Sequence, residues 1–458
     1  MGAQVMPAKN MSDLVSLCKR RGFIFGGSEI YGGMQGIYDF GPNGVELMKN
    51  IKEAWWNSMV YQRDDIDGLS AAILSPRMVW KYSGHEGVFS DPLVICKKCG
   101  HRMRQDKMAD QTKCDSCGSN DLNPPINHLL MMGLGVGAVG PGEINAYLRP
   151  ETATTTYTNF RNVLDSSGRK LPFGLVQIGK AFRNEIAPRN FVFRLREFEQ
   201  MEMQYFINPA DDDMNYWQEW KKIRMDWWIN VIGIPAKSLR FKPHETLAHY
   251  AKAAGDIEYD FPDGFDELEG IHNRQDFDLG SHTKNQSEFN IRANVPKNKD
   301  STMKLNYVDA QTGKSFIPFV IETAVGVERA MLAVLLNAYT EEDLGNGNSR
   351  IVLKMKPSLS PIKAAVIPLV RNVPKLLEIA ETIERDLRAL SLGRIVIENS
   401  GNIGKNYRRH DEIGTPVCIT VDHQTLDDGM VTLRDRDTMA QTRVAIADVS
   451  AKLKEVVK

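Results

Sequence analysis

The chain of 458 residues lacks long hydrophobic runs and has almost no net charge. No segment reaches the roughly eighteen uninterrupted apolar residues that a membrane-spanning helix requires. The N-terminal stretch MGAQVMPAKNMSDLV has no apolar run resembling a signal peptide. These absences predict a cytoplasmic protein with no membrane partner. Because the formal net charge is only −1, any polyanion has to be held by local patches and not by the field of the whole molecule.

Cysteine is also scarce, with six in the chain, and four of them stand in two close pairs, CKKCG and CDSCG. These four are Cys96, Cys99, Cys114 and Cys117. The spacing is typical of a structural zinc site, in which four thiolates hold Zn²⁺ tetrahedrally. Two disulfides are the alternative, which a reducing cytoplasm disfavours. Cys18 and Cys418 lie in apolar sequence and are expected to be buried thiols.

Apolar residues make up 42% of the chain, enough for the cores of two or three domains. Residues 45–60 form an expected helix with an apolar face that fits either the core or a subunit interface. The residues of this face are Val45, Met48, Ile51, Trp55 and Met59.

The pattern changes at residues 354–361, KMKPSLSP. Expected strands and helices alternate beyond that point, so the C-terminal part is predicted to be a small α/β domain. The strands are expected at 364–370, 394–398, 416–421 and 430–435, and the helices at 373–390, 405–413 and the end of the chain.

Gly135, Gly137 and Gly140 match the spacing of a dinucleotide-binding loop. No clear strand precedes them, and Pro141 follows where that motif requires a helix. We therefore expect a loop without a dinucleotide.

Residues 181–203, AFRNEIAPRNFVFRLREFEQMEM, interleave arginine and glutamate with phenylalanine. The spacing predicts two strands, with a turn at 187–190 and a return strand from Phe191 to Met203. Arg194 and Arg196 then share one face of their strand. Taken alone, this is a salt-bridged surface hairpin, but guanidinium groups also bind phosphate and stack on aromatic bases.

Residues 320–332, VIETAVGVERAML, predict a strand, a small-residue turn and a helix that opens with Glu328 and Arg329. Phe-Arg-x-Glu followed much later by Gly-x-Glu-Arg resembles motifs two and three of class II aminoacyl-tRNA synthetases. Activation of an amino acid by ATP needs positioning and charge neutralisation and no acid or base. Arginines, carboxylates and aromatic planes suit that chemistry.

Four weaker signals remain. Arg149 and Glu151 are a candidate pair for the two ends of a zwitterionic amino acid, or a surface ion pair. The acidic and aromatic residues 253–282 fit either Mg²⁺ on ATP or solvated loops. His85 is expected to hydrogen-bond within its loop. The C-terminal basic cluster fits an RNA contact or a solvated helix face; it consists of Lys405, Arg408 and Arg409.

Over nearly its whole length, the sequence closely resembles the dimeric class II glycyl-tRNA synthetases. The segments that carry the resemblance are GSEIYGG, YDFGPNGVEL, SGHEGVFSDP, the cysteine pairs, LRPETA, AFRNE, FRLREFEQME, ELEGI, NRQDFDLGSH, VIE, GVER, GKNYRRHDEIGTP and DDGMVTLRDRDTM. The resemblance implies a homodimer that uses MgATP to activate glycine and then transfers it to the 3′ end of tRNA(Gly).

The resemblance also implies an α+β fold, with an antiparallel sheet core flanked by helices, a small zinc-knuckle insertion and a C-terminal α/β anticodon-binding domain. The helix at 45–60 becomes the motif-one dimer element. The implied boundaries are 1–95 for the first part of the catalytic core, 96–120 for the knuckle, 121–354 for the rest of the core and 355–458 for the anticodon-binding domain.

The resemblance further assigns site residues. Arg183 would hold the α-phosphate, Phe198 and Arg329 would lie on the two faces of the adenine, and Glu267 would be a magnesium ligand, so that Arg183, Arg329 and Glu267 are the implied catalytic residues. The implied ATP-binding set is Arg183, Asn184, Glu185, Phe193, Arg194, Leu195, Arg196, Glu197, Phe198, Glu267, Leu268, Gly326, Val327, Glu328 and Arg329. The implied glycine-binding set is Arg104, Glu151, Phe198, Glu199, Gln200, Met201, Glu202, Glu322, Thr323, Ala324, Val325 and Gly326. The implied tRNA contacts are Lys405, Arg408 and Arg409.

Glycine has no side chain, so selectivity for glycine must come from binding its ammonium group and from leaving no room for a β-carbon. The chain departs from the family near this expected site. RPETATTTY stands where the family usually reads RPETAQGIF, and Glu322, Thr323 and Ala324 stand where it reads Glu-Pro-Ser. Leu195 replaces a common threonine.

Two alternatives to a glycine enzyme are open. A catalytically silent relative could act as a nucleic-acid-binding accessory subunit, although such a protein would be expected to lose the ATP arginines that are present here. A class II enzyme for proline or serine is disfavoured by GSEIYGG and SGH.

Overall fold

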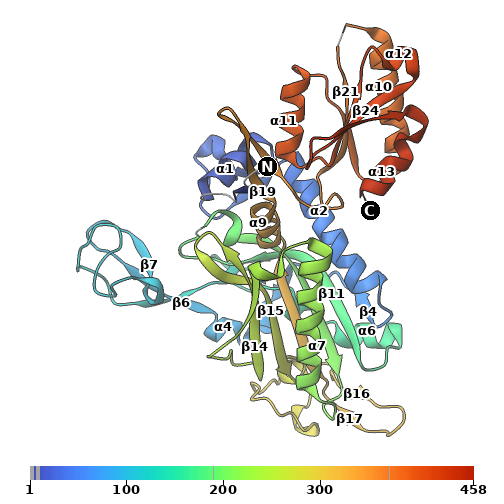
Figure 1. Cartoon of the computed structure of the whole chain (residues 1–458). Helices are drawn as coiled ribbons and strands as arrows, with labels where there is room; N and C mark the ends of the chain where they lie inside the picture. The colour runs from blue at the N-terminus through green and yellow to red at the C-terminus, as the bar shows by residue number, and fades with distance from the viewer. Residues whose placement is uncertain (1–4, 7–10, 189, 371, 458) are drawn as a thin grey trace.

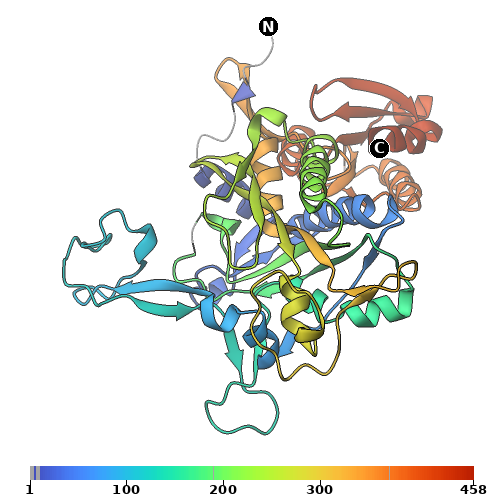
Figure 2. The same ribbon diagram turned by 90° about the horizontal axis from the view of Figure 1, so that it is seen from below.

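The computed structural model describes residues 5–6, 11–188, 190–370 and 372–457. Figure 1 shows a central core, a unit around β6 (Ser90–Ile95) and β7 (Arg102–Arg104) that projects from it, and a C-terminal part. Figure 2 shows the same unit projecting when the molecule is seen from below. Within the described ranges, no helix has the length and apolar character needed to cross a membrane.

The core is built on a seven-stranded sheet in the order β13-β14-β15-β18-β12-β11-β4. Neighbouring strands are antiparallel except β11 and β4, which are parallel. The strands are β4 (Ile66–Gly68), β11 (Phe173–Phe182), β12 (Glu197–Ile207), β13 (Leu239–Pro243), β14 (Ala253–Phe261), β15 (Gly264–Gln275) and β18 (Phe319–Gly326). The predicted α+β architecture with an antiparallel core sheet is confirmed.

The sheet separates two apolar clusters. On one face, Met201 and Met203 of β12 join a large core with helices α2 (Pro42–Trp56), α7 (Asp213–Asp226) and α9 (Val327–Ala338). On the other, Phe206 packs with residues of the short helices α5 (Ala153–Tyr157), α6 (Phe160–Ser167) and α8 (Phe277–His282). Because side chains alternate along a strand, successive residues of β12 point to opposite faces of the sheet.

Helix α2 starts at Pro42, whose fixed φ suits a first helical position, and a π-helical turn continues it through Asn57–Tyr61. Met48, Ile51, Trp55 and Met59 are buried as predicted. The Val45 side chain is 53% exposed, so this residue of the apolar face lies outside the core. The first turn packs through Gly44 instead, where an added Cβ would lie 2.0 Å from the Phe23 carbonyl oxygen.

The predicted strand pair exists, with Phe182 of β11 opposite Glu197 of β12. The return strand begins at Glu197 and not at Phe191, because Asn190 and Phe191 adopt left-handed backbone with φ near +59° and +57°. A short 3₁₀ turn at Phe191–Phe193 follows. Arg189, part of the predicted turn, lies outside the described residues.

The C-terminal sheet has the order β22-β21-β23-β24-β25. Four predicted strands and three predicted helices are confirmed, with ends shifted by a few residues. Strand β25 was not predicted, because its residues are largely polar and partly exposed. The elements are β21 (Ile362–Pro368), α10 (Pro374–Arg388), β22 (Arg394–Ile397), α11 (Ile403–Ile413), β23 (Val417–Val421), α12 (Thr425–Asp428), β24 (Met430–Asp435), β25 (Gln441–Ala445) and α13 (Val449–Val457).

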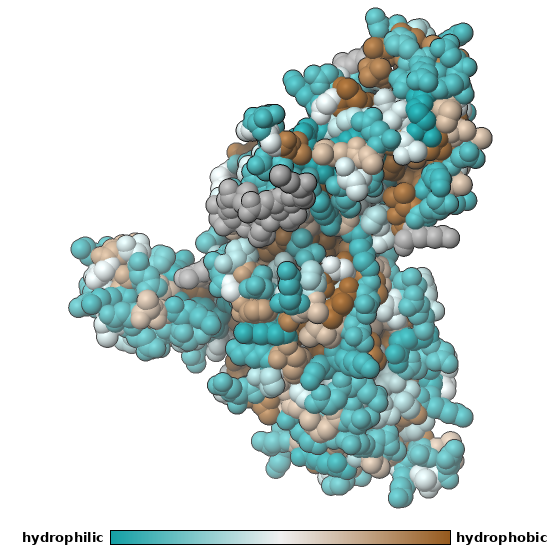
Figure 3. All heavy atoms as spheres, viewed as in Figure 1, coloured by the Kyte–Doolittle hydropathy of each residue, from teal (hydrophilic) through white to brown (hydrophobic). Residues whose placement is uncertain are grey.

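The projecting unit consists of β6, β7 and β8 (Ile126–Leu129) in one small sheet, with the cysteine pairs beyond it. Figure 3 shows mostly hydrophilic residues on the viewed face of this unit. The glycine-rich residues 135–145 form a loop between β9 and β10, as predicted, although the short strand β9 directly precedes them where no strand was expected. The remaining elements are β1 (Val5–Met6), α1 (Met11–Arg20), β2 (Ile24–Gly26), β3 (Tyr38–Phe40), β5 (Leu74–Pro76), α3 (Arg77–Tyr82), α4 (His85–Val88), β9 (Met132–Leu134), β10 (Ala146–Leu148), β16 (Tyr307–Val308), β17 (Ser315–Phe316), β19 (Tyr339–Gly345) and β20 (Asn348–Leu353), with short turns between them.

Candidate active site

A cavity of about 390 Å³ lies over β12, β15 and β18. Its walls combine carboxylates, arginines and aromatic rings. The lining residues are Phe89, Asp91, Arg104, Leu130, Glu151, Arg183, Glu185, Val192, Phe193, Arg194, Leu195, Phe198, Gln200, Glu202, Tyr250, Glu267, Gly270, His272, Arg274, Glu322, Ala324, Val325, Gly326, Glu328 and Arg329.

One end of the cavity collects three carboxylates, from Glu151, Glu202 and Glu322. Burial, followed by repulsion from Glu322 and Glu151, raises the pKa of Glu202 to about 8. Glu202 Oε1 accepts a hydrogen bond of 2.8 Å from Gln200 Nε2, and Thr152 Oγ1 donates to its other oxygen. Such a group of acidic side chains is electrostatically complementary to a small cation.

Glu322 is held between basic groups. Its Oε2 lies 3.0 Å from Arg274 Nη1 and 2.9 Å from His272 Nδ1. Burial opposes ionisation of this carboxyl, but the charge of Arg274 and the contact with His272 outweigh burial and lower its pKa. Arg274 also forms a buried ion pair with Asp278 at 2.7 Å. Glu322 is therefore ionised in the folded protein.

The other end of the cavity carries cations beside aromatic rings. Arg183 Cζ lies 5.3 Å from the centre of the Phe198 ring, and Arg329 Cζ lies 4.4 Å from the centre of the Phe193 ring. Arg329 Nη1 lies 2.7 Å from Glu267 Oε1. The charge of Arg329 is the main reason that the pKa of Glu267 is lowered. Flat cations and rings in this arrangement suit a nucleotide base and its phosphates.

Arg104, from β7 of the projecting unit, also lines the cavity. Arg104 Nη1 lies 2.9 Å from Asp91 Oδ2 of β6. Arg194, further along the wall, lies 3.9 Å from Glu185. The small sheet of the projecting unit therefore supplies part of the cavity wall.

Several residues of the implied sets lie off the cavity. Glu199 and Met201 point to the opposite face of β12 from Gln200 and Glu202, with Glu199 bound to Lys52 at 2.7 Å. Strand alternation is the reason. The residues that do not line the cavity are Asn184, Arg196, Glu197, Glu199, Leu268, Met201, Thr323 and Val327, of which Leu268, Met201 and Val327 belong to the large apolar core.

Arg149 does not reach the cavity, so the predicted pair with Glu151 is wrong. Its guanidinium is buried and donates to the carbonyls of Ala71 and Lys180 and to Gln177 Oε1, at 2.7 to 3.0 Å. Arg149 thus ties neighbouring segments together.

Eight lining residues were missed from the sequence, namely Phe89, Asp91, Leu130, Val192, Tyr250, Gly270, His272 and Arg274. Gly270, His272 and Arg274 stand two residues apart in β15, so they share one face of that strand. Strand alternation within ELEGIHNRQ could have revealed them. Phe89 and Tyr250 come from loops, for which the sequence carries no comparable signal.

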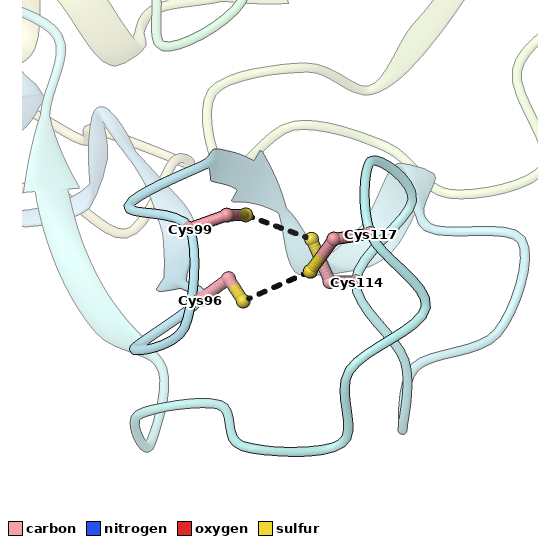
Figure 4. A group of neighbouring side chains, drawn as sticks. All are labelled: Cys96, Cys99, Cys114 and Cys117. Carbon is pink, nitrogen blue, oxygen red and sulfur yellow. Dashed lines mark hydrogen bonds between the residues drawn. The ribbon is translucent and has the colours of Figure 1, made fainter.

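The four cysteines of the projecting unit converge (Figure 4). Their sulfur atoms all lie within 4.8 Å of one another, and the Cys96–Cys117 and Cys99–Cys114 pairs are each 3.7 Å apart. Four thiolates about 2.3 Å from a tetrahedral Zn²⁺ stand about 3.8 Å apart, so the geometry fits zinc. A disulfide needs about 2.05 Å, which excludes the alternative pairing in this structure. Cys18 and Cys418 are buried, as predicted.

The C-terminal basic cluster lies on α11. Lys405, Arg408 and Arg409 line a shallow surface hollow together with Arg21 of the core. Arg409 Nη1 is bound to Glu398 and to Ser400 Oγ, each at 2.7 Å. The basic surface therefore spans the junction of the two parts of the chain.

Comparison with known proteins matches residues 141–338 to the class II tRNA synthetase core domain (G, H, P, S and T) and residues 363–456 to the anticodon binding domain. A protein of Deinococcus radiodurans named glycine–tRNA ligase is 48% identical, with 97% of this chain and 98% of that protein covered. Proteins of the same name from Thermus thermophilus and Borreliella burgdorferi are 48% and 47% identical, covering 99% and 97% of this chain and 100% and 97% of their own lengths. The chain therefore belongs to the glycine–tRNA ligase family of class II synthetases.

Proposed function

We propose that this chain is a glycine–tRNA ligase that forms glycyl adenylate from glycine and ATP and then transfers glycine to tRNA(Gly). The observation that carries the proposal is the convergence in one cavity of Arg183, Arg329 and the three carboxylates. A silent accessory subunit has no need of this arrangement.

In the first step, an oxygen of the glycine carboxylate attacks the α-phosphorus of ATP, and the bond to the departing pyrophosphate breaks. Arg183 neutralises charge at the α-phosphate, while Phe198 and Arg329 lie on the adenine. Glu151, Glu202 and Glu322 hold the glycine ammonium group. Catalysis then consists of positioning and charge neutralisation, without proton transfer by the protein.

In the second step, a hydroxyl of the 3′-terminal adenosine of the tRNA attacks the carbonyl carbon of the adenylate, the bond from that carbon to the phosphate oxygen breaks, AMP leaves, and the hydroxyl proton passes to the departing phosphate or to water. We propose that Lys405, Arg408 and Arg409 contact this tRNA. Their position on an exposed surface hollow of α11 supports the role, since phosphate contacts are made by accessible lysines and arginines.

Two metal ions fit the residues present. Glu267 lines the cavity with a side chain that is 49% exposed, so its carboxylate would hold Mg²⁺ on the phosphates of ATP. Cys96, Cys99, Cys114 and Cys117 would hold a structural Zn²⁺.

We further propose that the protein is a cytoplasmic homodimer, with α2 as part of the subunit interface. We also propose that the domain boundaries fall after residues 95, 120 and 354. Exposed apolar residues on this helix region, Val45 and Tyr61, support an interface there. The separate apolar cluster within residues 364–457 supports the last boundary.

The test is glycine-dependent exchange of labelled pyrophosphate into ATP by the purified, zinc-loaded chain. We expect exchange with glycine and none with alanine or serine. Arg329→Ala should reduce the rate at least about 100-fold, because an interaction with the transition state is lost. Arg161→Ala, which removes an exposed ion pair on α6, is the control. Absence of exchange by folded wild type would refute the proposal.

The tRNA contacts have a separate test. Arg409→Ala should leave pyrophosphate exchange unchanged and weaken only the charging of tRNA. Equal loss in both assays would mean that α11 does something other than hold tRNA.

A further inference from the structure

The short segment Thr152–Tyr157 sends one hydroxyl toward each of the three cavity carboxylates. Thr152 Oγ1 donates to Glu202, and Thr154 Oγ1 donates to Glu151. The Tyr157 hydroxyl donates to Gln204 Oε1, and Gln204 Nε2 donates to Glu322 Oε1 at 3.0 Å. Glu202 and Glu151 are thus contacted directly, and Glu322 through Gln204, from α5 and its N-cap residue Thr152.

Glu151 is held at both of its oxygens. Oε1 accepts the Thr154 hydrogen bond at 2.6 Å, and Oε2 lies 3.2 Å from His85 Nε2. The His85 ring is itself fixed, with Nδ1 2.8 Å from Ser83 Oγ. Thr154 is fully buried. Loss of its hydroxyl would therefore free one oxygen of Glu151 in a place where water cannot readily replace the donor.

Glu322 is held in the same way. One oxygen faces Gln204, and the other faces Arg274 and His272. Burial raises the pKa of Tyr157 well above its usual value, so the phenol keeps its proton. Tyr157 therefore acts as a donor toward Gln204 Oε1, which turns the Gln204 amide nitrogen toward Glu322.

Thr154 and Tyr157 stand three residues apart on α5, so their side chains lie on the same face of the turn.

We propose that Thr154 and Tyr157 are positioning residues for glycine, which fix Glu151 and Glu322 in the orientation that receives the substrate ammonium group. The inference rests on the proposed function. Because glycine offers only its ammonium and carboxylate groups, misdirection of these acidic groups weakens glycine binding directly. ATP, bound at the opposite end of the cavity, is not affected.

The test measures the Kd of glycine by calorimetry and the KM values of glycine and ATP in pyrophosphate exchange. Thr154→Val keeps the shape of the side chain and removes the hydroxyl. We expect it to raise the Kd and KM of glycine at least about tenfold, as for a lost hydrogen bond to a charged group, with the KM of ATP unchanged. Thr154→Ser restores the hydroxyl and should bring both values back near those of wild type.

Tyr157→Phe should also weaken glycine binding, by a smaller factor because it acts through Gln204. Thr158→Val is the matched control, since the Thr158 hydroxyl donates only to the Thr155 carbonyl, at 3.2 Å, and reaches no carboxylate. It should leave the glycine Kd unchanged. Thermal unfolding of each variant separates loss of fold from loss of positioning.

An unchanged glycine Kd in Thr154→Val would overturn the inference. The inference would also be overturned if the KM of glycine and the KM of ATP rose together in Thr154→Val and Thr154→Ser did not restore them. That result would show that Thr154 has a general packing role. Absence of pyrophosphate exchange by wild type would count against the proposed function alone. The comparison of glycine Kd values between wild type and the variants would still test the positioning role.

Discussion

Glu328, the acidic residue of the Gly-x-Glu-Arg motif, is 1% exposed at the start of α9. Both of its oxygens accept from the Glu199 backbone N–H, at 3.0 and 2.9 Å. Burial nevertheless raises its pKa from 4.5 to about 7. The folded protein therefore binds this proton more tightly than the unfolded chain does.

The stabilising effect of this proton is fully present below pH 4.5 and is lost as the pH rises through about 7. We expect the free energy of unfolding of wild type to fall from pH 5 to pH 8 relative to Glu328→Gln, by on the order of 2 to 3 kcal/mol. Urea titrations at each pH measure this difference.

The control for this pH dependence is Glu455→Gln, which changes a glutamate on α13 whose side chain is 67% exposed. Its difference from wild type should stay constant over the same range. A constant difference for Glu328→Gln as well would show that Glu328 does not hold a proton in the folded state.

At this scale, residue types predicted chemistry well and contacts poorly. The arginines and glutamates of both motifs suggested a site for phosphate and a cation, and the structure brings Arg183, Arg329, Glu202 and Glu322 into one cavity. Arg149 carried the same chemical signal but is buried against carbonyl groups. Charge alone does not say whether a partner is a ligand or the protein's own backbone.

At the scale of elements, strand alternation decides which members of a run face the cavity. The implied glycine set includes the whole run from Phe198 to Glu202, but Gln200 and Glu202 line the cavity while Met201 enters the core. A strand period of two makes this outcome necessary. The sequence indicated the strand but not which of its two faces meets the cavity.

The projecting unit has a core of only a few buried residues, Val94, Cys96, Met103, Met108 and Cys114. An apolar cluster of this size does not stabilise a fold without a further feature such as a bound metal ion or a disulfide. We expect removal of zinc by a chelator to expose residues 96–122 to protease, while thermal unfolding of the core stays unchanged. Limited proteolysis with mass spectrometry, together with the measured zinc content, checks this.

Protection should return when zinc is added back, and Cys99→Ser should behave like the chelated protein without responding to zinc. Full protease resistance of the metal-free unit would contradict a structural role for the ion. Because Arg104 reaches the cavity from β7, the metal-free protein should also bind its substrates more weakly.

At the scale of the whole molecule, a buried ionic network joins the C-terminal part to the core. Asp411 of α11 accepts from Arg350 of β20 at 3.1 Å and from Arg434 of β24 at 2.8 and 2.9 Å. Arg350 also donates to the carbonyls of Arg436 and Asp437. These contacts fix the orientation of α11, which carries the basic cluster, relative to the cavity.

We expect Asp411→Ala to lower the free energy of unfolding by about 3 to 5 kcal/mol, because the buried guanidinium of Arg434 loses its counter-charge and that of Arg350 keeps only Glu342. Charging of tRNA should fall more than pyrophosphate exchange, since only charging requires the C-terminal part to be correctly oriented relative to the core. Urea titration and the two activity assays provide the measurements.

Asp428→Ala is the matched control in the same domain. It breaks an ion pair with Arg443 whose side chains are 28% and 26% exposed and which solvent screens, so the free energy of unfolding should fall much less than for Asp411→Ala. Equal effects of the two substitutions, or equal losses in exchange and charging for Asp411→Ala, would refute the role of the network in joining the parts.

The sequence by itself determined the chemistry of this protein and the order of its parts. Its cysteine spacing, its two arginine motifs and the strand and helix alternation after residue 361 are local patterns, readable because each depends on neighbours in the chain. Only the tertiary structure decided which side of each strand meets the cavity and which arginines bind the protein's own carbonyls. It also decided that Thr154 donates to Glu151 and that Tyr157 acts on Glu322 through Gln204. Those outcomes depend on contacts between segments far apart in sequence, where burial and the need of every buried polar group for a partner select the arrangement.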